Sequence, residues 1–328
     1  MVKLSIVIPS YNVEDYILQT LSAVSKANVE TETIIVDDAS SDDTLAICQD
    51  YAKTDSRVKV ISCPENGGAG VARNIGMKHA RGEYIYFLDA DDVLSDGGLE
   101  KAVHLMDENG CDVLAFKYGY MTSESGHVTG MLSKDLSIWD AIVTKKREVK
   151  DVPVRANPRI LLTVNYPWNK IVRRDFIERT GLFFSKTSVN NDIYAHWHIY
   201  LHASKICLYN ETLIKHRVFA QREQITNVFD ARRFDAFEAL GDVERMILND
   251  EIMTRRYYHY FLQFKLELLK WINGRMDPGL RQEFLSRVRA SYRQMDPGLF
   301  LQAFDNAPGV ASESLTLGTQ PQLLLKLS

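Results

Sequence analysis

Short apolar runs alternate with amphipathic segments along the first part of the chain. Runs of mostly aliphatic, aromatic or β-branched residues, bounded by polar or turn-forming residues, predict buried strands at residues 4–8, 33–36, 58–61 and 84–88. Apolar residues spaced three and four apart predict helices between these strands, at residues 14–26, 43–52 and 69–80. This alternation predicts a parallel, doubly wound α/β sheet flanked by helices.

Each predicted strand ends in polar residues, and the fourth strand ends in a dense acidic group. Asp89, Asp91 and Asp92 place three carboxylates at the end of that strand. The carboxyl ends of parallel strands meet at one edge of an open sheet, where ligands bind. Carboxylates this close repel one another unless a cation lies between them, and a hard divalent cation prefers oxygen ligands. The pattern indicates either a nucleotide and metal site or a charged turn that caps the next helix.

A glycine-rich stretch, residues 67–70, precedes the third predicted helix. A dinucleotide-binding fingerprint would place its glycines in the first strand–helix turn, which here contains Pro9 and Tyr11 but no glycine. The stretch can still present backbone N–H groups to a phosphate at a helix N-terminus, and Arg73 can add a charged contact one turn later. The alternative for Arg73 is an exposed helix arginine.

The middle of the chain predicts strands at residues 112–116 and 208–218 and a hairpin at residues 117–131. Trp168 is flanked by proline and by an Asn-Lys pair. Its ring is interpreted either as a flat face for a sugar or as a core side chain that anchors a loop. A basic segment indicates a solvated face or, alternatively, a contact with anionic lipid or pyrophosphate, and its residues are Lys145, Lys146, Arg147 and Lys150.

From about residue 230 onward, aromatic and aliphatic residues recur at helical spacing. Two Asp-Pro-Gly sequences, at Asp277 and Asp296, each predict a helix start with proline in the first helical position. Residues 228–328 are therefore expected to form a helical C-terminal region. The sequence after about residue 306 is expected to be poorly ordered.

The composition is that of an ordinary globular protein, with 45% hydrophobic and 25% charged residues. A net charge of −4 argues against unspecific nucleic-acid binding, which requires a basic surface. The four cysteines are scattered without a Cys-x-x-Cys pair, so they indicate neither a zinc site nor a disulfide framework. The apolar N-terminus is too short for a secretory signal, and no apolar run reaches the roughly 18 residues of a transmembrane helix. A cytoplasmic protein is expected, and peripheral membrane contact is left open.

Four motifs, taken in order, resemble the family 2 glycosyltransferases. They are Val-Ile-Pro-Ser-Tyr-Asn at residues 7–12, Val-Asp-Asp-Ala-Ser at residues 36–40, Asn-Gly-Gly with Ala-Arg-Asn-Ile-Gly at residues 66–76, and the run into Asp-Ala-Asp-Asp at residues 82–92. Members of that family are inverting enzymes with the GT-A fold, a Rossmann-like, mostly parallel sheet flanked by helices. The resemblance therefore implies this fold and a glycosyltransferase activity.

The resemblance also implies a division of the chain. It is strong over residues 1–116 and extends less specifically to about residue 227, through the Pro-Trp-Asn-Lys segment and an Asn-Asp pair. It implies a GT-A domain over residues 1–227, with a nucleotide-sugar half (1–116) and an acceptor half (117–227). The helical region, residues 228–328, is not covered.

Matching motif positions imply roles for single residues. In the family, the nucleoside pocket would be lined by Pro9, Tyr11 and Asp38, and Asp38 would accept a hydrogen bond from the uracil of a UDP-sugar. The nucleobase or the diphosphate would lie near Gly67, Gly68 and Arg73. In the family's Asp-x-Asp motif, Asp91 would bind Mn²⁺ or Mg²⁺, while Asp89 would contact the ribose, the sugar or the metal. His216 would be a third metal ligand or, alternatively, a strand histidine satisfied within the protein.

The implied reaction moves a sugar from a nucleotide sugar to a hydroxyl of a glycan or lipid-linked acceptor in bacterial surface polysaccharide synthesis, such as that of capsules. Family members usually carry Glu-Asp before the acceptor-side helix, and the aspartate is the catalytic base. This chain has Asn191-Asp192, so Asp192 is the expected base although the glutamate is missing. Alternatively, the N-cap of that helix is Asn190, Asn191 or Asp192.

Two other functions are weighed against this one. A sugar nucleotidyltransferase shares the sheet architecture but needs a glycine-rich, arginine-containing loop after the first strand, which residues 9–12 do not supply. A non-catalytic partner that binds nucleotide sugars would act through the helical C-terminal region, by homodimerisation or by membrane docking. Nucleotide binding without transfer or donor hydrolysis would favour this partner.

Overall fold

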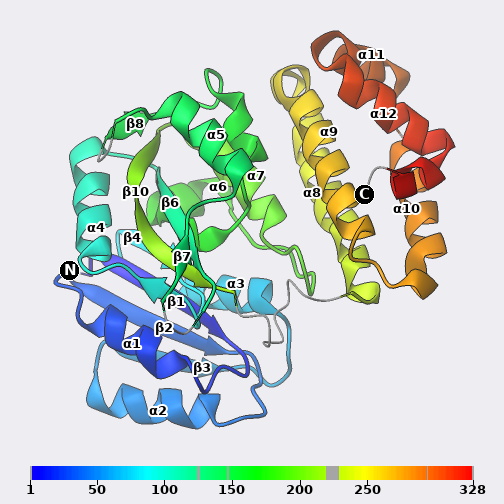
Figure 1. The fold of residues 1–328 in the computed structure, drawn as a ribbon. Helices are drawn as coiled ribbons and strands as arrows, with labels where there is room; N and C mark the ends of the chain where they lie inside the picture. Colours follow the sequence, from blue (N-terminus) through cyan, green and yellow to red (C-terminus); the bar gives the residue numbers. More distant parts are fainter. Residues whose placement is uncertain (1, 124–125, 146–147, 219–228, 294, 327–328) are drawn as a thin grey trace. The chain divides into compact units, whose positions relative to one another are not determined.

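The computed structural model describes residues 2–123, 126–145, 148–218, 229–293 and 295–326 (Figure 1). The chain separates into two compact units. One unit contains Met1–Lys186 with Ala195–Arg222, and the other contains Thr187–Tyr194 with Glu223–Ser328. The expected boundary at residue 227 lies outside the described residues, and the short segment Thr187–Tyr194 belongs to the unit that contains the helical region.

The first unit is built on a mixed sheet, which has ten strands among the described residues, in the main order β3-β2-β1-β4-β9-β6-β10-β5. The four strands predicted from the first part of the chain are all present and pair in parallel. Their bounds are β1 Leu4–Ser10, β2 Thr31–Asp37, β3 Val58–Ser62 and β4 Tyr84–Phe87. The parallel half of the sheet therefore follows the pattern of short apolar runs.

The second half of the sheet is mixed. β9 (Lys170–Arg173) runs antiparallel to both β4 and β6, whereas β10 (Ile206–Arg217) runs parallel to β6 (Val113–Met121). The predicted hairpin forms between β6 and β7 (Val128–Thr129). β5 (Val93–Leu94) and β8 (Val149–Asp151) both pair antiparallel with β10. In the basic segment Lys145 and Lys150 are exposed, and Lys146 and Arg147 lie outside the described residues.

Helices cover this sheet, and α3 shows how closely they pack. A Cβ atom added at Gly76 of α3 would lie 2.4 Å from a Val7 side-chain carbon, so only glycine allows the helix to approach β1 this closely. Phe87 and Phe176 belong, with Val7, to a core cluster that includes residues of the buried strand β4. The helices are α1 Ile17–Ser25, α2 Thr44–Thr54, α3 Ala69–His79, α4 Gly98–Asn109, α5 Ser133–Ile142, α6 Arg174–Thr180 and α7 Ile193–His202.

The amino edge of the sheet is held by Glu32. Its carboxylate accepts hydrogen bonds from the Ser5 hydroxyl at 2.6 Å, from the Arg81 backbone N–H at 2.6 Å and from the Arg81 guanidinium at 2.9 and 3.0 Å. Burial opposes ionisation, but these hydrogen bonds lower the pKa of Glu32 below its ordinary value of 4.5. Glu32 therefore ties β1 and β2 to the turn that precedes β4.

Replacing Glu32 with glutamine is expected to destabilise the protein by about 1.5–3 kcal/mol at neutral pH, because hydrogen bonds to a charged group are lost. Since the folded-state pKa is lowered, the stabilisation is present above pH 4.5 and is lost as pH falls through the folded-state value. The thermal unfolding midpoints of the unmodified protein and of Glu32→Gln should therefore converge as the pH is lowered into the acidic range. Glu30→Gln, at an exposed position two residues earlier, is the control, and a midpoint gap that persists at low pH would contradict the assignment.

The second unit is helical. Its helices are α8 Asp235–Leu248, α9 Glu251–Asn273, α10 Arg281–Arg293, α11 Pro297–Asn306 and α12 Pro308–Thr319, with 3₁₀ turns at Ala231–Phe234, Pro278–Leu280 and Pro321–Lys326. Both predicted Asp-Pro-Gly starts are confirmed, because the Asp277 and Asp296 side chains accept backbone N–H groups at these sites. None of the described helices is both long and apolar enough to span a bilayer.

The expected poor order after residue 306 is not what the structure shows. Pro308 begins α12, where its fixed φ suits the first turn of a helix. Ala311 and Leu317 are fully buried on the inner side of this helix. The buried side of α12 consists mostly of small residues, which allow the helix to approach its neighbours closely. Such a side carries little of the large-residue pattern from which an ordered helix is predicted.

Candidate functional site

The carboxyl ends of β1 and β2 meet at Asp38. Its carboxylate accepts the backbone N–H of Gly67 at 2.8 Å and that of Gly68 at 2.7 Å, and its own N–H donates to the Ser10 carbonyl at 2.9 Å. Asp38 is only 3% exposed. The expectation that the Gly67 and Gly68 amides face a phosphate is therefore corrected, because both amides bind Asp38. Asp38 fixes the glycine loop to the sheet.

The neighbouring backbone explains the need for glycine in this loop. Gly68 precedes α3 with φ at 84°, a conformation that side chains with a Cβ atom rarely adopt. Pro9 lies within β1 and is partly exposed, and Tyr11 follows the strand with 47% of its surface exposed. An exposed aromatic ring beside an anchored loop provides a face on which a planar base can stack.

Arg73 binds the acidic group at the end of β4. One of its terminal nitrogens lies 2.7 Å from the Asp89 carboxylate, and its guanidinium lies over the Phe184 ring, 5.4 Å from the ring centre. The Arg73 side chain is 6% exposed and that of Asp89 is 25% exposed. The alternative of an exposed helix arginine is therefore wrong. Arg73 neutralises part of the carboxylate cluster, as the repulsion argument requires.

Asp92 pairs with His216 across the sheet. The Asp92 carboxylate lies 2.6 Å from His216 Nδ1, and the Asp92 side chain is fully buried. Burial raises the pKa of Asp92 to about 7. Burial acts against the charged form of His216 too, but the Asp92 charge and hydrogen bond raise the pKa of His216 to about 9. Asp92 is thus a histidine partner rather than only a helix cap, and its hydrogen bond engages Nδ1 of His216.

His216 also belongs to an aromatic cluster. The Trp168 ring is nearly parallel to that of Tyr166, at a ring-centre distance of 4.6 Å and an angle of 20°, and to that of His216, at 5.3 Å and 19°. The Tyr166 and His216 rings are themselves 6.1 Å apart. The Tyr86 hydroxyl donates to the Trp168 carbonyl at 2.8 Å. Trp168 is 1% exposed, so both of its faces are covered by protein. The structure corrects the proposal that its ring faces a sugar, and the core-anchor alternative describes it.

Two residues at this edge were not identified from the sequence. Arg217 is 7% exposed, donates to the Gln19 side chain at 2.6 Å and lies over the Tyr16 ring. The Thr20 hydroxyl donates to the Ala90 carbonyl at 2.8 Å and so holds the acidic turn to α1. The sequence could have indicated Arg217, because it directly follows the candidate histidine. Nothing in the sequence distinguishes Thr20, which lies in the middle of a helix.

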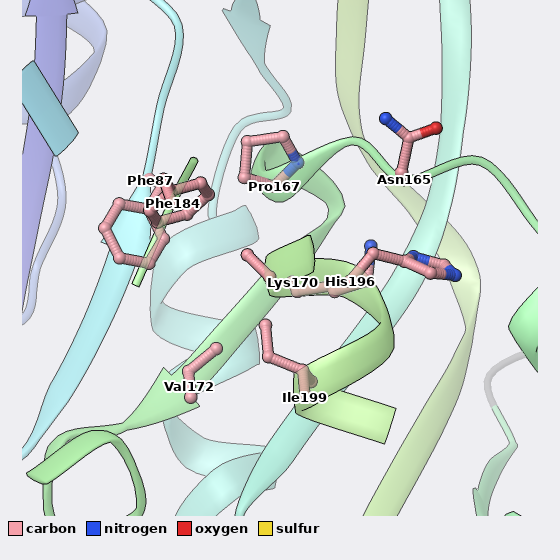
Figure 2. Close-up of a pocket in the computed structure, with 9 residues that line it drawn as sticks. Phe87, Asn165, Pro167, Lys170, Val172, Phe184, His196 and Ile199 are labelled. Carbon is pink, nitrogen blue, oxygen red and sulfur yellow. The ribbon is translucent and has the colours of Figure 1, made fainter. Parts of the chain in front are cut away.

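A small cavity lies beside the end of β4, where Phe87 lines it. Figure 2 shows Phe87 and Phe184 on one side of it and Lys170 and His196 on the other. Its volume of about 10 Å³ has room for about one water molecule, too little for a sugar. His196 Nε2–H donates to the Leu161 carbonyl at 3.1 Å, and burial together with the nearby Lys170 charge lowers the pKa of His196 well below 6.5. This histidine is therefore neutral and structural.

The residues proposed for a metal ion provide suitable atoms but do not form a closed cage. Asp89 and Asp91 offer carboxylate oxygens, and His216 would offer Nε2 after a metal displaces its proton; these atoms suit Mn²⁺ or Mg²⁺. Within the described ranges, no three His, Cys, Asp or Glu side chains converge closely enough to hold a metal by themselves. Mg²⁺ commonly takes one or two carboxylates and completes its shell with substrate phosphates and water. The donor set fits such a shared site.

Asp192 lies in the segment Thr187–Tyr194, directly before α7. It is half-buried, and Asn190, two residues earlier, has a left-handed φ of 60°. That conformation makes the backbone turn sharply ahead of the helix, and asparagine tolerates it better than most residues do. Asp192 thus lies in a short, tightly turned loop that belongs to the second unit.

Comparison with known proteins supports the sequence resemblance. The model of "Glycosyl transferase family 2" matches residues 5–181, which is more than half of the chain. A putative teichuronic acid biosynthesis glycosyltransferase, TuaG of Bacillus subtilis, is 41% identical over 121 residues, covering 37% of this chain and 48% of the relative. Glycosyltransferase GlyG of Streptococcus pneumoniae is 28% identical over 218 residues, covering 65% of this chain and 70% of the relative. For the first two curated relatives, the matched region spans about half of their length.

Solved structures show the same fold. The crystal structure of Staphylococcus aureus TarS 1–349 in complex with UDP-GlcNAc matches with a TM-score of 0.74 at 20% sequence identity. The match covers 98% of this chain and 92% of that one. The predicted fold class, GT-A with a helical C-terminal region, is confirmed.

Proposed function

Because this chain belongs to glycosyl transferase family 2, we propose that it transfers a sugar from a nucleotide diphosphate sugar to a hydroxyl group of a glycan or lipid-linked acceptor. The observation that carries the proposal is the group of charged pairs at the carboxyl edge of the sheet. Asp38 fixes the glycine loop, Arg73 binds Asp89, and Asp92 binds His216. Relatives named for teichuronic acid and poly(ribitol-phosphate) synthesis support a role in surface polysaccharide synthesis.

The donor is proposed to be a UDP-sugar. This chain shares its fold with TarS, whose crystal structure was solved in complex with UDP-GlcNAc. The exposed ring of Tyr11 would stack on the base, with Pro9 beside it. The Asp38 carboxylate would accept a hydrogen bond from the uracil edge, through lone pairs that the glycine amides leave available. Arg73 would approach the donor together with Asp89. The Asp38 carboxylate would thus both fix the glycine loop and recognise the nucleobase.

A divalent cation, Mn²⁺ or Mg²⁺, is proposed to be held by Asp91, with Asp89 and His216 as further ligands and the donor diphosphate completing the site. When bound, such a cation neutralises negative charge on the diphosphate as a Lewis acid. Asp92 would support this arrangement, since its hydrogen bond to Nδ1 of His216 leaves Nε2 as the ring nitrogen for the cation. The Trp168 ring, stacked on the imidazole, limits its rotation.

Asp192 is proposed as the base that takes the proton from the acceptor hydroxyl. One base and one in-line displacement would invert the configuration at the anomeric carbon. The support for this role is the Asn-Asp pair directly before α7, where the family carries its catalytic aspartate. Peripheral membrane contact and homodimerisation through the helical region would place the enzyme near a lipid-linked acceptor, and both belong to this proposal.

A thermal-shift panel tests the proposal. UDP, UDP-sugars and the corresponding GDP and CDP compounds are added with and without MnCl₂, and a UDP-sugar with Mn²⁺ is expected to raise the unfolding midpoint most, because ligands that bind only the folded state stabilise it. Stabilisation by no UDP compound would refute the donor assignment. Stabilisation by UDP without transfer or donor hydrolysis would favour the non-catalytic partner.

A further inference from the structure

The segment Thr187–Tyr194 lies between two stretches of the first unit in the sequence, yet it belongs to the helical unit in the structure. Eight residues are too few to form a core, so their position depends on the contacts that they make. The segment contains Asp192 and has no regular secondary structure before α7 begins at Ile193. What holds this segment therefore also decides where Asp192 lies.

Asp235 binds the beginning of the segment. It is the first residue of α8, and its carboxylate accepts the backbone N–H of Ser188 at 2.6 Å and that of Val189 at 3.4 Å. Ser188 and Asp235 are 47 positions apart in the sequence. A carboxylate that accepts two successive backbone N–H groups fixes both the position and the direction of that stretch of chain.

The end of the segment lies beside the same helix. Burial, and after it the charge of Asp242, raises the pKa of Tyr194, so Asp242 lies near that side chain. Asp242 follows Asp235 by seven residues, or about two helical turns, and seven-residue spacing brings both acids to one face of α8 at about 10 Å from each other. Between the two ends, Asn190 turns the chain and its carbonyl accepts the Ile193 N–H at 3.3 Å.

The face of α8 next to these acids is anchored in the unit. Ala236, Ala239 and Val243 are fully buried, and α8 packs along the long helix α9. A helix packed in this way is a firm support, because its side chains are held by a close-packed core. The acidic face of α8 is thus rigidly placed within the second unit.

We propose that the helical C-terminal unit positions the loop of the catalytic base, and that Asp235 is the positioning residue that anchors this loop to α8. The role of Asp192 as base rests on the proposed function. The anchoring of Thr187–Tyr194 by Asp235 stands on its own contacts. On this proposal the helical unit holds the loop that carries Asp192, in addition to any docking role.

Asp235→Ala tests the proposal in the full-length chain. It removes the acceptor of the Ser188 and Val189 N–H groups, so their hydrogen exchange should accelerate, and the turnover number should fall about tenfold, equivalent to about 1.4 kcal/mol in the barrier. The affinity for UDP should remain unchanged, because the residues proposed to bind the donor lie on the sheet. Asp235→Asn keeps a side-chain oxygen acceptor and should restore most of the activity.

Asp250→Ala is the matched control. Asp250 caps α9 in the same unit and accepts the Met253 N–H at 2.9 Å, but it makes no such bond to Thr187–Tyr194. If Asp235→Ala matches this control in exchange and in turnover, the proposal is refuted. Faster exchange with unchanged turnover refutes the positioning role. If the unmodified chain binds no UDP and transfers no sugar, the proposed function fails, and hydrogen exchange alone decides whether Asp235 anchors the loop.

Discussion

Replacing Asp192 with asparagine is expected to lower the turnover number for sugar transfer by about 10²- to 10⁴-fold, the usual contribution of a general base. Asparagine has nearly the same shape but cannot take a proton, so folding and donor binding should change little. The measurement is steady-state transfer to an acceptor hydroxyl, paired with UDP affinity by calorimetry. A large loss in turnover with unchanged UDP affinity identifies a residue that acts in the chemical step.

A second aspartate serves as the control for this substitution. Asp175 lies in α6 with 79% of its side chain exposed, so Asp175→Asn should leave turnover and UDP affinity unchanged. Near-normal turnover in Asp192→Asn would move the base to another residue. In that case, the asparagine at position 191, where the family usually has glutamate, would indicate that this chain no longer uses the family's catalytic base.

The parallel half of the fold could be predicted from the sequence because local pattern and tertiary structure agree there. Residues 84–87, for example, are apolar, flanked by Gly82 and by acids, and fully buried between two neighbouring strands. The mixed half could not be predicted in the same way. β9 is four residues long, and only its partners β4 and β6 determine that it runs antiparallel. Strand direction in such short segments depends on contacts distant in sequence.

The residues of the site were largely predictable, but their pairings were not. The acids at the ends of β2 and β4 were visible as charges after apolar runs. That Asp38 binds the glycine loop and Asp92 binds His216 depends on contacts across 29 and 124 positions. Of the two interpretations of the Trp168 ring, the structure bears out the core anchor and not the sugar face. Flanking proline and polar residues suggested an exposed face, whereas stacking on Tyr166 and His216 buries it.

Replacing Asp91 with asparagine is expected to abolish metal-dependent donor binding and to lower transfer by about 10²- to 10³-fold, since a cation at a diphosphate contributes several kcal/mol to the transition state. Two acids at this turn make ion pairs, because Asp89 lies 2.7 Å from Arg73 and Asp92 lies 2.6 Å from His216. Asp91 is half-buried at the end of the same strand, and the resemblance to the family's Asp-x-Asp motif assigns the metal ligand to this position.

Metal titration separates this role from a structural one. In the unmodified protein the affinity for UDP should rise as MnCl₂ is added, whereas in Asp91→Asn it should stay at the metal-free value, because one of the few protein ligands is gone. Asp96→Asn, at an exposed position five residues later, should titrate like the unmodified protein. If Asp91→Asn keeps the full Mn²⁺ response, Asp89 and His216 would have to hold the cation. Arg73 would then have to release Asp89 when the donor binds, which a charge reversal at Arg73 could test directly.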